Sequence, residues 1–76
     1  MANNEKMVSG LCKLNAQTKK QLESWNIEIN YSLEDEDVNK AKGKIQGYLK
    51  ALVQMGIIDQ EEARELGRFY IVELKK

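Results

Sequence analysis

The 76-residue chain contains no histidine and no proline. Without histidine it lacks the commonest general base and the commonest zinc ligand of proteins. Without proline, no residue forces a helix to break, which suits a mostly helical chain. A domain this small also rarely has room for a cleft in which catalytic groups converge. We therefore expect a protein that is not an enzyme, with no cofactor, no bound metal ion and no small-molecule substrate.

Cysteine is scarce as well, since Cys12 is the single one in the chain and a disulfide bond within it is excluded. A small domain without a disulfide bond fits a reducing compartment. No stretch approaches the roughly 20 apolar residues of a membrane span, and residues 1–5 do not have the basic-then-apolar order of a signal peptide. The sequence therefore predicts a cytoplasmic protein that does not contact membranes.

The chain carries no excess charge, because twelve lysines and arginines balance twelve aspartates and glutamates. This balance gives no argument for a nucleic acid, a membrane or an acidic substrate as the partner. The length predicts one domain, residues 1–76. Its core must be small, since a chain this short buries only about 60–65% of its unfolded surface.

Residues 38–75 carry the clearest pattern, which is that of two amphipathic helices separated by a glycine. In the first of them, apolar residues recur mainly at steps of three and four and therefore share one face. These residues are Val38, Ala41, Ile45, Tyr48, Leu49, Leu52 and Val53. The second helix carries an apolar stripe of Ala63, Leu66, Tyr70 and Leu74.

The connection between these helices has recognisable signals for a stop and a start. Gly56 is expected to end the first helix in the left-handed conformation that glycine tolerates, with Ile57 folding back onto Leu52. Asp59 then caps the next helix, and Glu62 three residues later completes a capping box. Because the connection is short, the helices must run antiparallel, and residues 34–76 are predicted to form an αα-hairpin.

The first half of the chain also has apolar residues at steps of three and four, which favours one helix from about residue 4 to residue 30. The stripe consists of Met7, Leu11, Leu14, Thr18, Leu22, Trp25 and Ile29. Gly10 and Asn15 are the positions at which this helix could divide in two.

Residues 26–33 allow another interpretation, because apolar and polar residues alternate there as in a strand. No second strand is recognisable as a partner, and Asn26 and Asn30 are poor helix formers. We therefore predict helix to about Trp25, followed by an extended connector. The expected fold is all-α: a small three-helix domain with an N-terminal helix and connector in residues 1–33 and the antiparallel αα-hairpin in residues 34–76.

Glu34, Asp35, Glu36 and Asp37 form an acidic run. Acids at the start of a helix favour the positive end of its dipole, and Ser32 or Asp35 is placed to cap that helix. The run lacks the spaced oxygen ligands and the turn glycine of calcium loops, which argues against a cation site. It is interpreted first as a helix N-terminus and alternatively as an acidic contact with a basic partner.

Gly43 and Gly47 are predicted to lie opposite the apolar face of their helix, beside Lys40, Lys44 and Lys50. Each glycine costs about 0.8–1 kcal/mol relative to alanine in a helix interior. Either the site is a weak spot on a solvated face, or a partner backbone or a phosphate approaches closely while the lysines supply charge. We call these five residues the lysine ridge, and they are the candidate contact for nucleic acid.

The last helix is predicted to be apolar over more than half of its circumference. Phe69 and Val72 lie off its stripe, and Ile71 lies on the other flank. Either the N-terminal helix covers this surface, or another subunit or protein does. Trp25 and Tyr31 suit the core or an interface, where aromatic residues are favoured. These five residues form the candidate protein interface.

The stretch KAKGKIQGYLKALVQMGIIDQEEARELGRFYIVEL resembles short, uncharacterised proteins carried by phages and mobile elements. Their shared pattern is a basic helix with Gly-Tyr-Leu, a Gly-Ile or Gly-Val-Ile turn, an acidic cap and a helix that ends in aromatic residues. The resemblance covers about half of the chain. It implies a helical hairpin and an origin in a phage or mobile element, and it transfers no activity and no site residues.

These observations lead to one leading hypothesis and two alternatives. The leading one is a non-enzymatic protein-interaction module, a small adaptor or inhibitor that binds another protein or itself as a homo-oligomer. The first alternative is a nucleic-acid-associated regulator that uses the lysine ridge, whose binding would weaken with salt. The second is an inhibitor that places the acidic run on a nucleic-acid-binding enzyme.

Overall fold

Four α-helices and one π-helical turn make up the computed structural model, which describes residues 4–74. The elements are α1 (Asn4–Lys13), α2 (Ala16–Tyr31), α3 (Asp35–Gln54), α4 (Gln60–Arg68) and η1 (Phe69–Glu73). No strand occurs among these described residues, so the all-α prediction is confirmed. The prediction of three helices is wrong, because the N-terminal helix is divided in two.

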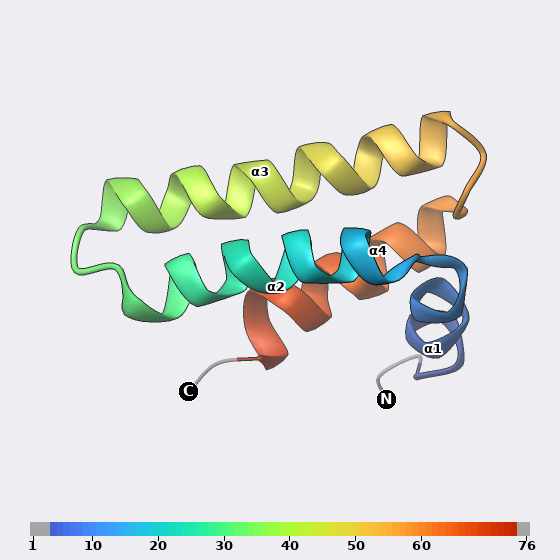
Figure 1. Ribbon diagram of the computed structural model, residues 1–76, viewed down its shortest axis with the longest axis horizontal. Coiled ribbons are helices and arrows are strands. Elements are labelled where there is room, and N and C mark those ends of the chain that lie inside the picture. Colours follow the sequence, from blue (N-terminus) through green and yellow to red (C-terminus); the bar gives the residue numbers. More distant parts are fainter. Residues whose placement is uncertain (1–3, 75–76) are drawn as a thin grey trace.

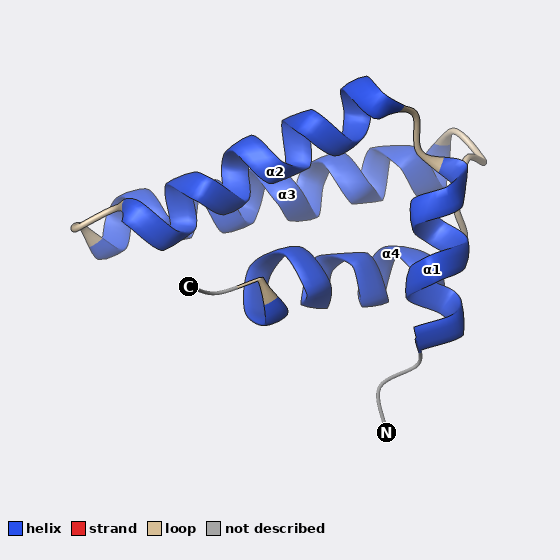
Figure 2. Cartoon of the chain, turned by 60° about the horizontal axis from the view of Figure 1, so that its bottom comes forward, coloured by secondary structure: helices blue, strands red, loops and turns tan. Residues whose placement is uncertain are grey.

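The segments α2, α3 and α4 with η1 run back and forth, and the N-terminal helix α1 crosses one end of them (Figure 1). Figure 1 shows α2 and α3 lying antiparallel, with α4 returning along α3 and continuing into η1. Figure 2 shows α1 running steeply across the end of the molecule at which α4 begins. None of the helices in the described part combines the length and apolar character that crossing a membrane requires.

The division of the N-terminal helix occurs at one of the two positions considered from the sequence. Asn15 is the N-cap of α2, and its side-chain oxygen accepts a hydrogen bond from the Thr18 N–H at 2.7 Å. Gly10 stays inside α1, where it is buried against Leu66. A Cβ atom at position 10 would lie 2.8 Å from Leu66 Cδ1, so glycine here lets α1 approach α4 closely.

Residues 26–31 are helical, which corrects the predicted extended connector. Asn26 is buried, and its amide nitrogen donates to the Tyr70 carbonyl at 2.6 Å and to the Leu74 carbonyl at 3.1 Å. Asn30 donates to the same Leu74 carbonyl at 2.8 Å. These contacts with η1 and its end outweigh the weak helix propensity of asparagine. They also satisfy carbonyls that the end of a helix leaves without partners.

The turn after α3 has the predicted geometry. Gly56 has a φ of +76°, its N–H donates to the Val53 carbonyl, and the Ile57 N–H donates to the Leu52 carbonyl, both at 3.0 Å. This double hydrogen bond is a Schellman motif. Ile58, which is only 4% exposed, enters the core, whereas Ile57 is 39% exposed. The residue that packs inward is therefore one position later than expected.

The start of α4 is capped as predicted. The Asp59 side chain accepts from the Glu62 N–H at 2.7 Å, and the Glu62 side chain accepts from the Asp59 N–H at 2.9 Å. The two bonds satisfy donors that the first turn would otherwise leave free. This box sets the direction in which α4 returns along α3.

All five elements contribute to the core or pack against it. The buried apolar residues come from α2, α3, α4 and η1, from the α1–α2 connection and from the α3–α4 connection. Met7 and Leu11 of α1 pack on them. They are Leu14, Leu22, Ile29, Ala41, Ile45, Leu49, Leu52, Ile58, Leu66, Tyr70 and Ile71. Burying such side chains is the main favourable contribution to folding. The predicted stripes thus face the core.

Candidate functional site

A groove runs along the surface between α3 and α4 and continues beside η1. Its volume is about 460 Å³. It is lined by Gln46, Leu49, Lys50 and Val53 of α3, by Gln60, Ala63, Arg64, Gly67 and Arg68 of α4, and by Ile71 and Val72 of η1. Leu49 and Ile71 are buried, so the floor of the groove is apolar and belongs to the core.

Small residues keep the α4 side of the groove open. Ala63 and Gly67 lie one helical turn apart and both line it. A Cβ atom at position 67 would lie 3.6 Å from Leu49 Cδ1, which is ordinary van der Waals contact. The close packing of α3 and α4 therefore does not require glycine at position 67. Its effect is to leave space above the Leu49 side chain.

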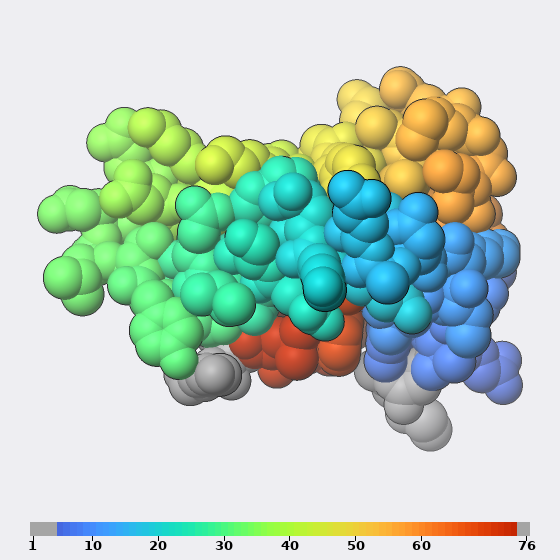
Figure 3. Space-filling model, in the orientation of Figure 1, coloured from blue at the N-terminus to red at the C-terminus, as the bar shows by residue number. Residues whose placement is uncertain are grey.

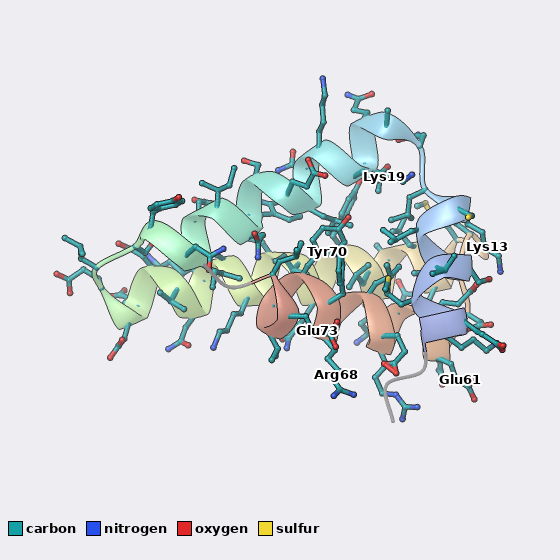
Figure 4. All side chains as sticks on the ribbon, turned by 90° about the horizontal axis from the view of Figure 1, so that it is seen from below. Lys13, Lys19, Glu61, Arg68, Tyr70 and Glu73 are labelled. Carbon is teal, nitrogen blue, oxygen red and sulfur yellow. The ribbon has the colours of Figure 1, made fainter. Side chains whose placement is uncertain are left out.

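The rim of the groove carries positive charge from both helices. Lys50, Arg64 and Arg68 are exposed. Among the described residues, neither Lys50 nor Arg64 has a carboxylate within ion-pair distance. Arg68 Nε lies 3.7 Å from Glu73 Oε1, and the two side chains are 55% and 38% exposed. Figure 4 shows Arg68 pointing outward while Tyr70, two positions later, points between the helices.

A buried carboxylate holds α1 against the helix that forms one wall of the groove. Glu62 is 0% exposed and accepts hydrogen bonds from Lys13 Nζ at 2.8 Å and from the Ser9 hydroxyl. These bonds, first that of Lys13, then that of Ser9 and then that of the Asp59 N–H, lower the pKa of Glu62 to about 2 in spite of its burial. The carboxylate is therefore ionised and fully partnered, and its role is to position α4.

Further ion pairs lie beside it at the surface. Lys6 Nζ is 3.2 Å from Asp59 Oδ2 and 3.8 Å from Glu61 Oε2. The hydrogen bond from the Glu62 N–H is the main cause that lowers the pKa of Asp59, and the hydrogen bond to Asp59 is the main cause that raises the pKa of Lys6. These exposed pairs add little stability, because water and salt screen them.

The five residues of the candidate protein interface do not form one surface. Ile71 and Val72 line the groove, and Val72 is 56% exposed. Phe69 is half-buried and lies edge-to-face on Tyr70 with ring centroids 5.1 Å apart. Trp25 is half-buried on the core and lies edge-to-face on Tyr48 at 5.5 Å. Tyr31 is 63% exposed near the α2–α3 connection.

Sequence reasoning missed most of the groove. Periodicity assigns Leu49, Val53 and Ala63 only to the core, and it does not single out Arg64 or Arg68. The signal was present at helical spacing, because Gln60, Ala63, Arg64, Gly67, Arg68 and Ile71 fall on one flank of the last helix. That flank is mixed in character, so it does not stand out as an apolar stripe.

The lysine ridge is a solvated face of α3. Gly43 and Gly47 are exposed, and a Cβ atom at either would meet nothing within 4 Å. Lys40 Nζ lies 3.6 Å from Glu36 Oε1 in an exposed pair one turn apart. Lys50 is the member of the ridge that also lines the groove. Within the described chain, no backbone approaches the two glycines closely.

The acidic run lies at the N-terminus of α3, as predicted. The capping residue is Glu34, whose side chain makes no cap hydrogen bond, so the expected cap by Ser32 or Asp35 is wrong. All four acids are exposed. Within residues 4–74, no three histidine, cysteine, aspartate or glutamate side chains are grouped so that they could hold a metal ion.

A second hollow, of about 370 Å³, lies beside the aromatic pair of α2 and α3. It is lined by Asn15, Gln17, Thr18, Gln21, Trp25 and Tyr48. Thr18 Oγ1 and the Tyr48 hydroxyl are 3.4 Å apart across it. Its lining is mostly amide and hydroxyl groups, and the apolar floor of the groove between α3 and α4 has no equivalent there.

Comparison of the chain with protein-family models, with curated proteins and with solved structures gave no match. The resemblance to phage and mobile-element proteins therefore stays a prediction from the sequence. The chemistry of the groove, an apolar floor between cationic edges, is the feature of the described residues from which function is inferred below.

Proposed function

We propose that the protein is a non-enzymatic protein-interaction module, a small adaptor or inhibitor, that binds an apolar segment with acidic flanks in the groove between α3 and α4. The open apolar groove with its cationic rim is the observation that carries this proposal. The proposal keeps the cytoplasmic location and the phage or mobile-element origin that the sequence predicts.

The size and floor of the groove suit side chains from another polypeptide. A volume of about 460 Å³ is within the range of about 300–1,000 Å³ in which binding pockets usually fall. Leu49 and Ile71 form a floor that belongs to the core, while Val53 and Val72 remain partly or largely exposed. An amphipathic segment binds such a groove by inserting side chains from successive helical turns.

The rim selects the charge of the segment. Lys50 and Arg64 carry charges that no carboxylate of the described residues neutralises. Glutamates or aspartates beside the inserted side chains would supply the missing partners. Such complementary charges raise the rate of association and exclude partners of the wrong sign. A basic segment of the same shape would be repelled.

A pair of synthetic peptides tests this function. The first is a labelled peptide of about 15 residues with leucines at i, i+3, i+4 and i+7 and glutamates on the remaining face. The second replaces every glutamate by lysine. Fluorescence anisotropy should show that the first peptide binds and the second does not. Failure of the acidic peptide to bind at protein concentrations up to about 1 mM would remove the proposal.

The lysine ridge supports a second candidate function, that of a nucleic-acid-associated regulator. Gly43 and Gly47 leave open space beside exposed Lys40 and Lys44, so a phosphate backbone could approach the helix closely. The acidic run at the start of the same helix opposes this function, and Glu36 already pairs with Lys40. A mobility-shift experiment at low salt tests it. Absence of any shift with DNA or RNA would exclude it.

A further inference from the structure

The connection between α2 and α3 carries an apolar side chain in an acidic setting. Leu33 is 99% exposed, and Glu34, Asp35, Glu36 and Asp37 follow it directly. Figure 1 shows that η1 ends well short of this connection, so within residues 4–74 only α2 and α3 reach this end of the molecule. Figure 3 shows the same end projecting from the body of the protein. We call residues 33–37 the acidic tip.

The acidic tip and the groove have opposite and matching chemistry. The tip offers one unprotected leucine beside four carboxylates, and the groove offers an apolar floor between Lys50, Arg64 and Arg68. We propose that the groove of one molecule binds the acidic tip of a second copy of this chain. This inference rests on the proposed function, because it names the segment that the groove accepts.

The two surfaces cannot meet within one molecule. Asp35 begins α3, and Lys50 lies on the rim of the groove. Fifteen residues of α-helix separate them by roughly 22 Å, since each residue adds about 1.5 Å. A rigid helix therefore keeps the tip away from its own groove. The contact is between two different surfaces of two copies, so repeated contacts form an open chain or close into a ring.

The test is sedimentation velocity of the full chain at a series of protein concentrations and at low salt. Two variants each remove one side of the contact. Leu33→Ser removes the leucine of the tip, and Val72→Glu places a carboxylate in the groove. Each variant alone should weaken association at least about tenfold, as expected when one buried apolar contact is lost. Val8→Ser, which changes an apolar residue 50% exposed on α1, is the matched control and should associate like the unchanged chain.

Mixing the two variants identifies the contact. The Leu33→Ser chain keeps an intact groove and the Val72→Glu chain keeps an intact tip, so an equimolar mixture should form a one-to-one complex that goes no further. Circular dichroism should show that each variant keeps its helices. A mixture that stays monomeric overturns the inference, as does an unchanged chain that is monomeric at every concentration. If the acidic peptide still binds in those cases, the proposed function stands and only the second copy as occupant is excluded.

Discussion

Glu62 of α4 and Lys13 of α1 are joined by a hydrogen bond of 2.8 Å across 49 positions of sequence. The Glu62 side chain is 0% exposed and the Lys13 side chain is 47% exposed, so the pair joins the core to the solvent. Taking a carboxylate out of water is costly unless its oxygens are hydrogen-bonded. Lys13, Ser9 and the Asp59 N–H together meet that requirement. The pair therefore ties α1 to the helix that lines the groove.

The protein should lose stability in acid because of this pair. The pKa of Glu62 is lowered from 4.5 to about 2 by folding, so the folded state binds a proton less readily than the unfolded state. The contribution is therefore complete above about pH 4.5 and is lost as the pH falls towards 2. Urea unfolding at several pH values should show this decline in the free energy of unfolding. The lowered pKa of Asp59 acts in the same direction.

Glu62→Gln isolates the contribution of this carboxylate to the pH dependence of the free energy of unfolding. The variant should be less stable than the unchanged chain by about 1–3 kcal/mol at pH 7, because a charged hydrogen-bond acceptor in the core is lost. The difference should close as the pH falls towards 2. Glu28→Gln, which removes an exposed carboxylate of α2, is the control and should leave the profile unchanged. An equal difference at every pH would contradict this role of Glu62.

Asn26 should be critical for holding η1 against α2. Its amide nitrogen, which comes from α2, donates to the backbone carbonyls of Tyr70 and Leu74. It thereby gives hydrogen-bond partners to carbonyls in η1 and at its end. Asn26→Asp replaces the donor by an oxygen that faces those carbonyls, and it should lower the free energy of unfolding by about 1–3 kcal/mol. Hydrogen exchange should also speed up at the amides of η1. Unchanged exchange there would show that the contact does not hold η1 in place.

The exposed glycines of α3 should be replaceable with a gain in stability. A Cβ atom at Gly43 or Gly47 meets nothing within 4 Å, so alanine at either should stabilise the protein by about 0.8–1 kcal/mol. Gly10→Ala is the contrast, since its Cβ would lie 2.8 Å from Leu66 Cδ1 in the buried contact with α4. It should not show the gain. Thermal unfolding of the three variants measures the gain expected at positions 43 and 47 and its absence at position 10. A loss of stability at position 43 or 47 would mean that the glycines meet a requirement within the fold.

Most of the fold follows from local signals. Gly56, Asp59 and Glu62 act within a few residues of themselves, so the turn and the capping box are predictable from the sequence. The course of residues 26–31 is not predictable in this way. It depends on Asn26 and Asn30 meeting carbonyls of η1 more than forty positions later. The strand-like alternation there combines one buried residue, Ile29, with the exposed residues Ile27, Tyr31 and Leu33.

The groove is less predictable than the fold. Ile71 and Val72 could be singled out from the sequence because they lie off the apolar stripe of the last helix. Leu49, Ala63 and Gly67 could not, because their place in a groove depends on how far apart two packed helices lie. The volume of the groove depends on small side chains on α4 facing larger ones on α3. That distance and that pairing are properties of packing, which periodicity does not contain.

The positive rim should decide which peptide binds. Arg64 has no carboxylate partner among the described residues and faces solvent, so Arg64→Glu should leave stability nearly unchanged. It should weaken binding of the leucine–glutamate peptide at least about tenfold, because a favourable charge pair becomes a repulsive one. Lys20→Glu makes the same charge change on an exposed site of α2 and should have little effect. Equal losses in both variants would indicate attraction to overall charge without a specific rim.

The most direct measurement of the central claim is a heteronuclear NMR titration of the protein with the leucine–glutamate peptide. We predict that the largest changes in amide chemical shift occur at Val53, Gly67 and Ile71, which line the groove from both helices and η1. The amides of Glu28 and Lys20 on α2, which does not line the groove, should change little. Shifts that cluster around Lys40 and Lys44 or beside Trp25 and Tyr48, or no shifts at all, would contradict a binding site between α3 and α4.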